Sequence, residues 1–424
     1  MRQVSWALLG FTLLAAGAPP TLADDRPPLG EWTRRVAELG SDSFATRQRA
    51  TQELETAGPE VIPLVAEAVR SGDAEVRMRA LGILLAQSLS REPVRREKVR
   101  AALAGLISSS DPQAARFARG ASDRIREVTA ALAAAELTRL GATIMPVENS
   151  SPLKYNVQIR QTWSGGDERL SLVTELGEVP WLSMENAPVS DACLVHVARL
   201  TSLNKLYLGS SRIRCDRLGE LAPLKQLEYL SLKQLPLDDA KLATLPVFPY
   251  LRYLGLDGTQ ISDQGLVHLA RYPQLQTLWL DQTKITDAGL VHLKPLVNLR
   301  TLFLPGTRTA GPGLAELKHL PSLSYLSLKE AKLAPDSLKH IGQIEQLETL
   351  GLDHTNVTDD QLADLAGLTQ LRILWLSKTE VSDAGLEHLK ALKSLQVLYL
   401  HGSQVSAEGA EELRKALPQC HVAR

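Results

Sequence analysis

Cysteine is scarce in this sequence. Among 424 residues only Cys193, Cys215 and Cys420 occur. A small core stapled by a disulfide framework needs more, so the stability of this chain must come from the packing of apolar side chains. The sequence leaves open whether Cys193 and Cys215 form a single disulfide.

An excess of charge of either sign is also lacking. Lys and Arg together number 47 and Asp and Glu together 48, which gives a formal net charge of −1. Proteins that bind nucleic acid or anionic lipid depend on a basic surface. We therefore expect no nucleic-acid partner.

Sequence signatures of catalysis are missing as well. The chain contains no Gly-rich phosphate loop, no H-E-x-x-H, no G-x-S-x-G and no paired-cysteine metal spacing. Serine, histidine and acidic residues are present, but without a spacing that fixes their geometry. We therefore expect no enzyme, no catalytic residues, no cofactor and no metal.

The N-terminus carries an apolar run that is short for a membrane span. Arg2 precedes an apolar stretch over residues 6–18, and small residues follow up to Ala23. This pattern predicts a signal peptide over residues 1–23, cleaved near Ala23, because a spanning helix needs about 20 apolar residues. We expect an exported protein, periplasmic or extracellular, whose mature chain has no membrane span.

What the sequence does have is a ladder of leucines at a fixed interval of 24 residues. The ladder consists of Leu203, Leu227, Leu251, Leu275, Leu299, Leu323, Leu347, Leu371 and Leu395. Further leucines follow each of them three and five places on. A fixed period of this size indicates a stacked repeat array, in which each unit buries its apolar side against its neighbours.

Each repeat combines a strand, a bend and a helix. In the unit that begins at Leu275, the first apolar positions alternate with polar residues, as in a strand. Leu290, Leu293 and Leu296 recur at every third residue, as in a helical turn, and Thr286-Asp287 supplies the N-cap. Ten such units are expected over residues 179–424, the last with a C-terminal cap.

The sequence before the array is organised differently. Amphipathic helices are expected over residues 30–141, a linker over 142–154, and an atypical capping repeat over 155–178. The string from Leu39 to Gln87 resembles the HEAT-like repeats of exported bacterial repeat proteins. Whether this helical domain does more than cap or space the array stays open.

Strings such as TQISDQGLVHL, TKITDAGLVHL and TEVSDAGLEHL resemble the bacterial leucine-rich repeat family. The resemblance implies an α/β leucine-rich repeat horseshoe, a right-handed solenoid with a parallel sheet on its concave face, preceded by an all-α HEAT-like domain. Threonine stands where the general consensus has asparagine. Ala187, Leu235 and Ala331 lack even a hydroxyl at this position, so looser turns are expected there.

The residues between the inward leucines of each strand point to the concave face. Nine of the ten units place an aromatic residue there, although the chain has only 19 aromatic residues. The predicted ligand-binding residues are Trp181, Tyr207, Tyr229, Tyr253, Trp279, Phe303, Tyr325, Trp375 and Tyr399. Exposed aromatic patches are typical of contact sites, whereas rings that only cover small neighbours on the next strand would be a packing feature.

Acidic residues accompany the aromatic stripe. Asp257 and Asp281 occupy the same position in neighbouring units, which raises the hypothesis of a cation site. A hard cation needs more oxygen ligands than two adjoining carboxylates supply. We therefore interpret Asp257 and Asp281 as ordinary polar residues at the strand ends.

The resemblance and the aromatic stripe together predict a non-enzymatic scaffold that binds a protein partner. A polysaccharide is the alternative, because sugar rings stack on aromatic side chains such as Trp279 and Trp375. A purely structural spacer is the third hypothesis.

Overall fold

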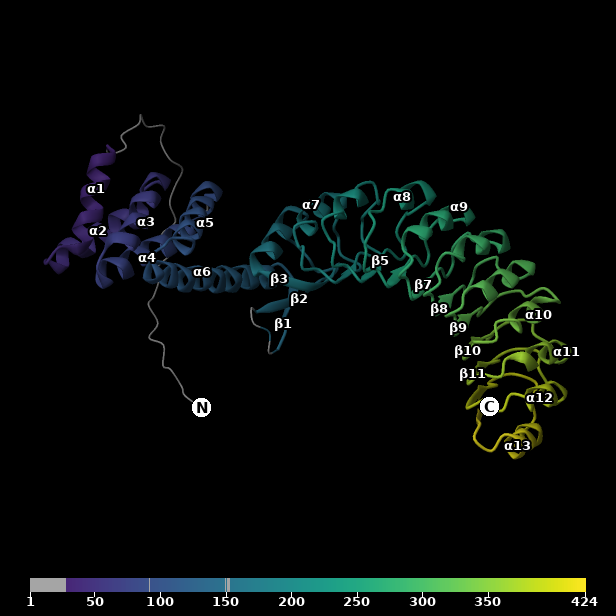
Figure 1. The fold of residues 1–424 in the computed structure, drawn as a ribbon. Coiled ribbons are helices and arrows are strands. Elements are labelled where there is room, and N and C mark those ends of the chain that lie inside the picture. The colour runs from purple at the N-terminus through teal and green to yellow at the C-terminus, as the bar shows by residue number, and fades with distance from the viewer. Residues whose placement is uncertain (1–27, 91, 149, 151–152) are drawn as a thin grey trace. The chain divides into compact units, whose positions relative to one another are not determined.

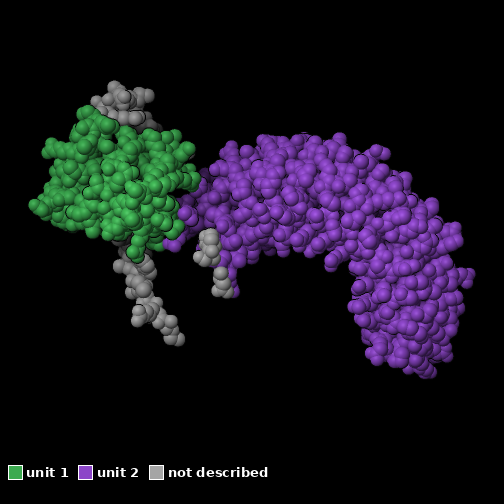
Figure 2. Space-filling view, in the orientation of Figure 1, with its two compact units in different colours: residues 1–125 green, residues 126–424 purple. Residues whose placement is uncertain are grey.

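The computed structural model describes residues 28–90, 92–148, 150 and 153–424. The predicted signal peptide therefore lies outside the described residues. The chain divides into two compact units, Met1–Ile125 and Arg126–Arg424 (Figure 2). Within the described residues, no helix combines the length and the apolar character that crossing a bilayer requires.

The first unit is helical. Its elements are α1 (Leu29–Ala37), η1 (Glu38–Gly40), α2 (Phe44–Thr56), η2 (Pro59–Val61), α3 (Ile62–Ser71), α4 (Ala74–Ser88), α5 (Pro93–Ile107) and the first part of α6 (Pro112–Arg139). Leu54, Val65 and Ile83 are fully buried in its core. The carboxylate of Asp73 accepts the backbone N–H of Val76 at 2.9 Å and so caps α4.

The second unit contains a sheet of 13 strands whose spatial order follows the chain. It opens with β1 (Ala142–Pro146), which pairs antiparallel with β2 (Lys154–Ile159). The sequence predicts a linker over residues 142–154, whereas the structure places β1 and the first residue of β2 there. Ala142 is buried in the core, so β1 extends the sheet, and the polar, proline-containing composition marks only the connection that follows it.

The repeats supply the next ten strands, all parallel (Figure 1). They are β3 (Glu178–Ser183), β4 (Lys205–Tyr207), β5 (Tyr229–Ser231), β6 (Tyr253–Gly255), β7 (Thr277–Trp279), β8 (Thr301–Phe303), β9 (Tyr325–Ser327), β10 (Thr349–Gly351), β11 (Ile373–Trp375) and β12 (Val397–Tyr399). Strand β13 (His421–Ala423) follows β12. From β3 to β12 each residue pairs with the residue 24 places on, for example Leu278 with Leu302, so the period of the sequence is the register of the sheet.

Short helices, many of them 3-10, follow the strands and lie on the outer side of the arc in Figure 1. They are η3 (Glu168–Leu176), η4 (Asp191–Cys193), α7 (Leu194–Val197), η5 (Leu218–Leu221), α8 (Asp239–Ala243), α9 (Asp263–Leu266), η6 (Val267–Arg271), η7 (Asp287–Leu293), η8 (Pro312–His319), α10 (Ser337–Ile341), α11 (Asp359–Leu362), η9 (Ala363–Gly367), α12 (Asp383–Leu389) and α13 (Ala407–Ala416). The strands occupy the inner side of the arc. We call the surface formed by the side chains of β3–β12 that point away from the buried leucines the concave face.

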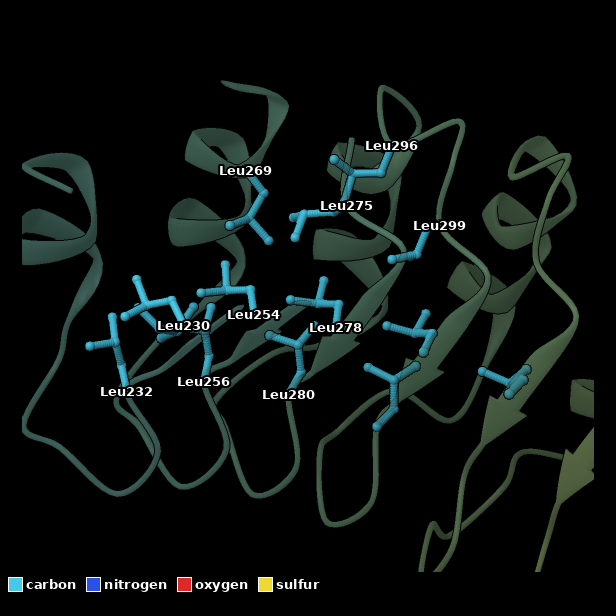
Figure 3. Packing of buried hydrophobic residues seen from close by; sticks show 14 of the residues in the cluster. Leu230, Leu232, Leu254, Leu256, Leu269, Leu275, Leu278, Leu280, Leu296 and Leu299 are labelled. Atoms are coloured by element: carbon cyan, nitrogen blue, oxygen red, sulfur yellow. The ribbon is translucent and has the colours of Figure 1, made fainter. Parts of the chain in front are cut away.

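Leucines fill the space between the strands and the helices. Leu254, Leu278 and Leu302 stack in register on three neighbouring strands and are each 0% exposed. Figure 3 shows Leu254 and Leu278 within this layer. Leu269 and Leu296 approach them from the helical side. The second unit is a leucine-rich repeat solenoid, and the fold class expected from the sequence is confirmed.

The same backbone hydrogen bond closes the turn after the strand in every unit compared. The hydroxyl of Thr283 donates to the carbonyl of Leu280 at 2.6 Å, and its backbone N–H donates to the same oxygen at 3.3 Å. The expectation of looser turns at Ala187, Leu235 and Ala331 was wrong, because their backbone N–H groups make the equivalent bond at 3.0–3.3 Å. The backbone closes the turn, and the threonine hydroxyl adds to it.

Aspartates tie successive units together on the helical side. The carboxylate of Asp263 accepts the backbone N–H of Thr286 at 2.8 Å and its hydroxyl at 2.6 Å. Asp239 binds Ser262 in the same way. The residue that caps one helix is thus also held by the preceding unit.

Candidate functional site on the concave face

All nine aromatic residues expected on the concave face lie on its strands. They are Trp181 on β3, Tyr207 on β4, Tyr229 on β5, Tyr253 on β6, Trp279 on β7, Phe303 on β8, Tyr325 on β9, Trp375 on β11 and Tyr399 on β12. Strand β10 carries Thr349 and Gly351 at these positions. The alternation of a strand puts these side chains opposite the buried leucines.

The structure brings the nine rings together into one connected row. Ring centroids are 5.8 Å apart for Trp181–Tyr207, 4.5 Å for Tyr207–Tyr229, 5.8 Å for Tyr229–Tyr253, 6.0 Å for Tyr229–Trp279, 5.8 Å for Trp279–Phe303, 4.9 Å for Phe303–Tyr325, 5.9 Å for Tyr325–Trp375 and 5.9 Å for Trp375–Tyr399. Four of these eight pairs are stacked. Part of each stacked ring's face is therefore covered by its neighbour.

The rings are partly exposed and keep polar groups available. Tyr253 is 36% exposed, and the other eight are half-buried. In the described part of the chain, the indole N–H groups of Trp279 and Trp375 donate to no protein acceptor and are open to solvent or a ligand. Burial raises the pKa of the phenol of Tyr229, and nearby Tyr207 and Asp257 raise it further. The row combines apolar area with hydrogen-bonding groups, as binding hot spots do.

A pair of carboxylates lies beside the middle of this row. One oxygen of Asp257 and one of Asp281 are buried and accept no hydrogen bond. Burial raises the pKa of Asp257. Burial, together with repulsion from Asp257, raises the pKa of Asp281 to about 6. Lys233 and Lys329 act in the opposite direction and lower the pKa values of Asp257 and Asp281, respectively. Among the described residues, no group of three or more His, Cys, Asp or Glu side chains is arranged to hold a metal ion.

The raised pKa of Asp281 predicts how stability changes with pH. Its pKa of about 6 in the folded chain lies above the ordinary value of 3.8. The folded state thus binds the proton more tightly than the unfolded state, and stability falls as the pH rises from about 4 through about 6. Asp281→Asn removes this loss, so urea unfolding should show a free energy of unfolding about 1 kcal/mol higher than wild type at pH 7, allowing for solvent screening. At pH 4 the two proteins should be equally stable. A variant that is no more stable than wild type at pH 7 would contradict the assignment.

The three cysteines take no part in this face. All three are free thiols in buried positions. Burial raises the pKa of Cys215 to about 12 and that of Cys420 to about 11. Such thiols are inert, because the thiolate is the reactive form.

The helical unit carries a groove that the sequence analysis missed. It lies between α4 and α6, has a volume of about 690 Å³, and is lined mainly by Met78, Leu81, Leu85, Phe117 and Ala121. Met78 is 59% exposed. Met78 and the small residues of α6 can be read from the sequence, but the groove arises only when the two helices pack.

Comparisons with known proteins give structural likenesses only. No family model matches the chain, and no curated protein matches it. An internalin of Listeria monocytogenes aligns over 64% of this chain and 86% of its own, with 18% identity and a TM-score of 0.41. A TDR receptor aligns over 59% and 44%, with 17% identity and a TM-score of 0.43. A leucine-rich repeat protein of Leptospira interrogans aligns over 60% and 80%, with 18% identity and a TM-score of 0.34. The fold assignment rests on the repeat period and the strand register described above.

Proposed function

We propose that this chain is an exported, non-enzymatic binding protein whose concave face holds a protein partner. The observation that carries the proposal is the connected row of nine aromatic rings on the exposed side of the sheet. A sheet face needs side chains to cover it, but it does not need a continuous row of half-exposed rings beside buried carboxylate oxygens that accept no hydrogen bond. Protein interfaces use both, because aromatic anchors and polar contacts share the same hot spot.

Ring geometry favours a protein over a polysaccharide. Trp279 and Phe303 are stacked on each other at an interplanar angle of 8°, and Trp375 and Tyr399 at 7°. Rings that stack on each other have less face to offer a sugar. Export rests on the N-terminal pattern up to Ala23, and on that basis the partner belongs to the cell envelope or the exterior.

Affinity capture tests the proposal. The chain from residue 24 onward, immobilised and exposed to the envelope fraction of its own cell, should retain a protein that mass spectrometry identifies. Binding of that purified protein should weaken about 10-fold or more with Trp279→Ala and with Trp375→Ala. Val291→Ala, an exposed residue on the helical side, serves as the matched control and should bind like wild type.

The same variants separate the other functions. If tryptophan fluorescence responds to soluble glycans while no protein is retained, the ligand is a polysaccharide and the proposed protein partner is rejected. If retained proteins bind Trp279→Ala and Trp375→Ala as tightly as wild type, the concave face is not the binding site and the proposal fails.

A further inference from the structure

The concave face repeats itself after four units. Tyr229 and Tyr325 are separated by 325 − 229 = 96 residues, which is four periods of 24. Three more concave positions carry the same residue at this interval, and a fourth carries an aromatic residue in both places. We define cluster 1 as Tyr229, Ser231, Gly255, Trp279 and Phe303, and cluster 2 as Tyr325, Ser327, Gly351, Trp375 and Tyr399.

The two clusters have the same geometry. The tyrosine and tryptophan rings are 6.0 Å apart at 50° in cluster 1, and 5.9 Å apart at 56° in cluster 2. The tryptophan and the following aromatic ring are 5.8 Å apart at 8° in cluster 1, and 5.9 Å apart at 7° in cluster 2. The same spatial arrangement of rings is therefore built twice.

A glycine makes this arrangement accessible in each cluster. Gly255 of β6 lies in register between Ser231 of β5 and Trp279 of β7, and Tyr229 approaches Trp279 diagonally from two residues before Ser231. Gly351 of β10 lies in the same way between Ser327 of β9 and Trp375 of β11, and Tyr325 approaches Trp375 diagonally. Because glycine has no side chain, the two rings meet across the intervening strand.

Two neighbouring exposed positions have not kept the same period. Arg252 just before β6 corresponds to Glu348, and Tyr253 corresponds to Thr349. Covering a sheet requires only apolar side chains of suitable size. Aromatic rings at closely similar distances and angles on a partly exposed surface, beside positions that differ, indicate that the same contact is made twice.

Carboxylates accompany both clusters. Asp257 lies near Tyr229 of cluster 1, Asp353 holds the matching position near Tyr325 of cluster 2, and Asp281 also lies near Tyr325. Within the described residues none of the three forms a salt bridge, whereas Lys233 is paired with Glu185 at 2.9 Å and Lys329 with Glu330 at 3.4 Å. Lys233 and Lys329 lower the pKa values of Asp257 and Asp281 but contact other carboxylates directly. Both clusters thus offer aromatic rings beside a carboxylate that a cation of the partner can contact.

We infer that clusters 1 and 2 are equivalent contact sites for one extended, basic segment of the protein partner. The inference rests on the proposed function and specifies its chemistry. Neighbouring strands lie about 4.8 Å apart, so four strands separate the sites by about 19 Å. An extended chain rises about 3.3 Å per residue and covers that distance in about six residues. The segment therefore carries two lysines or arginines about six positions apart, one for each cluster.

A random library of 12-residue peptides is the probe. Panning it against the chain from residue 24 onward should enrich peptides with two basic residues five to seven positions apart, since about six residues span the sites. The selected peptide should lose about 10-fold or more in affinity with Trp279→Ala, and again with Trp375→Ala. Asp257→Asn combined with Asp281→Asn should weaken it and reduce the effect of salt on binding, because charge pairs are screened.

Two controls guard against loss of folding. Trp279→Phe and Trp375→Phe keep the rings and should retain more of the affinity than the alanine variants, with unchanged thermal unfolding. Tyr250→Ala, an aromatic residue that is 52% exposed and lies outside the strands, should bind the peptide like wild type.

The outcomes distinguish this inference from the proposed function. If the enriched peptides lack spaced basic residues, if none is enriched, or if binding depends on one cluster alone, the inference of two equivalent sites is overturned while a protein-binding concave face can stand. If the enriched peptides and the captured partner ignore both tryptophan variants, the proposed function falls with it.

Discussion

Replacement of Leu278 by alanine is expected to lower the free energy of unfolding of the solenoid by about 3 kcal/mol. Leu278 is 0% exposed, and its partners in register, Leu254 and Leu302, are equally buried. Removing its side chain opens a cavity between three strands. Because neighbouring units share these leucines, no single unit relaxes without losing contacts with the next one.

Urea unfolding followed by circular dichroism measures this loss, and amide hydrogen exchange locates it. Exchange should accelerate in β6, β7 and β8 more than in β3 or β12, because each unit contacts only its neighbours. Thr277→Ala on the same strand, but on the concave face, is the matched control and should change stability by about 0.5 kcal/mol or less. A loss below about 1 kcal/mol for Leu278→Ala would contradict the role of the ladder.

The period of 24 residues was sufficient to predict the fold of the second unit. In a solenoid, residues one period apart in the sequence lie side by side on neighbouring units. Leu278 pairs with Leu302 as the ladder requires. For the same reason the nine concave aromatic residues could be listed in advance: two alternating positions per strand determine which side chains face outward.

Side-chain detail could not be predicted in this way. Whether Trp279 stacks on Phe303 or covers Gly255 depends on rotamers, and the structure shows the stack. The strand at residues 142–146 escaped prediction because its pairing with β2 is a tertiary contact that overrides the local composition. The 96-residue interval, by contrast, is present in the sequence. Only the structure shows that the ring pairs at this interval have similar distances and interplanar angles.

The sequence also contains a link between units that only the structure explains. Five units have an aspartate followed, 26 residues later, by a glycine: Asp239 and Gly265, Asp263 and Gly289, Asp287 and Gly313, Asp359 and Gly385, Asp383 and Gly409. Where Lys241, Ser337 and Gln361 replace the glycine, the preceding unit has Cys215, Gly311 and Pro335 in place of the aspartate. Cys193 and Arg217 are exceptions, since Asp167 and Asp191 precede them.

Steric contact accounts for this correlation. A Cβ atom added at Gly289 would lie 2.3 Å from a carboxylate oxygen of Asp263 and 3.1 Å from its Cα. The carboxylate has little freedom to move away, because it accepts both the N–H and the hydroxyl of Thr286. The glycine therefore makes room for the aspartate that ties the two units together.

Gly289→Ala is accordingly expected to lower the free energy of unfolding by about 2 kcal/mol, the cost of overpacking a fixed contact. Asp263→Ala alone should cost about 1–2 kcal/mol through its lost hydrogen bonds. In the double variant the alanine no longer meets a carboxylate, so Gly289→Ala should cost less than about 1 kcal/mol there, and a double-mutant cycle in urea should show a coupling of about 1 kcal/mol or more. Gly219→Ala is the matched control, because the nearest atom to its added Cβ is 3.9 Å away. Strictly additive costs would mean that the glycine and the aspartate do not depend on each other.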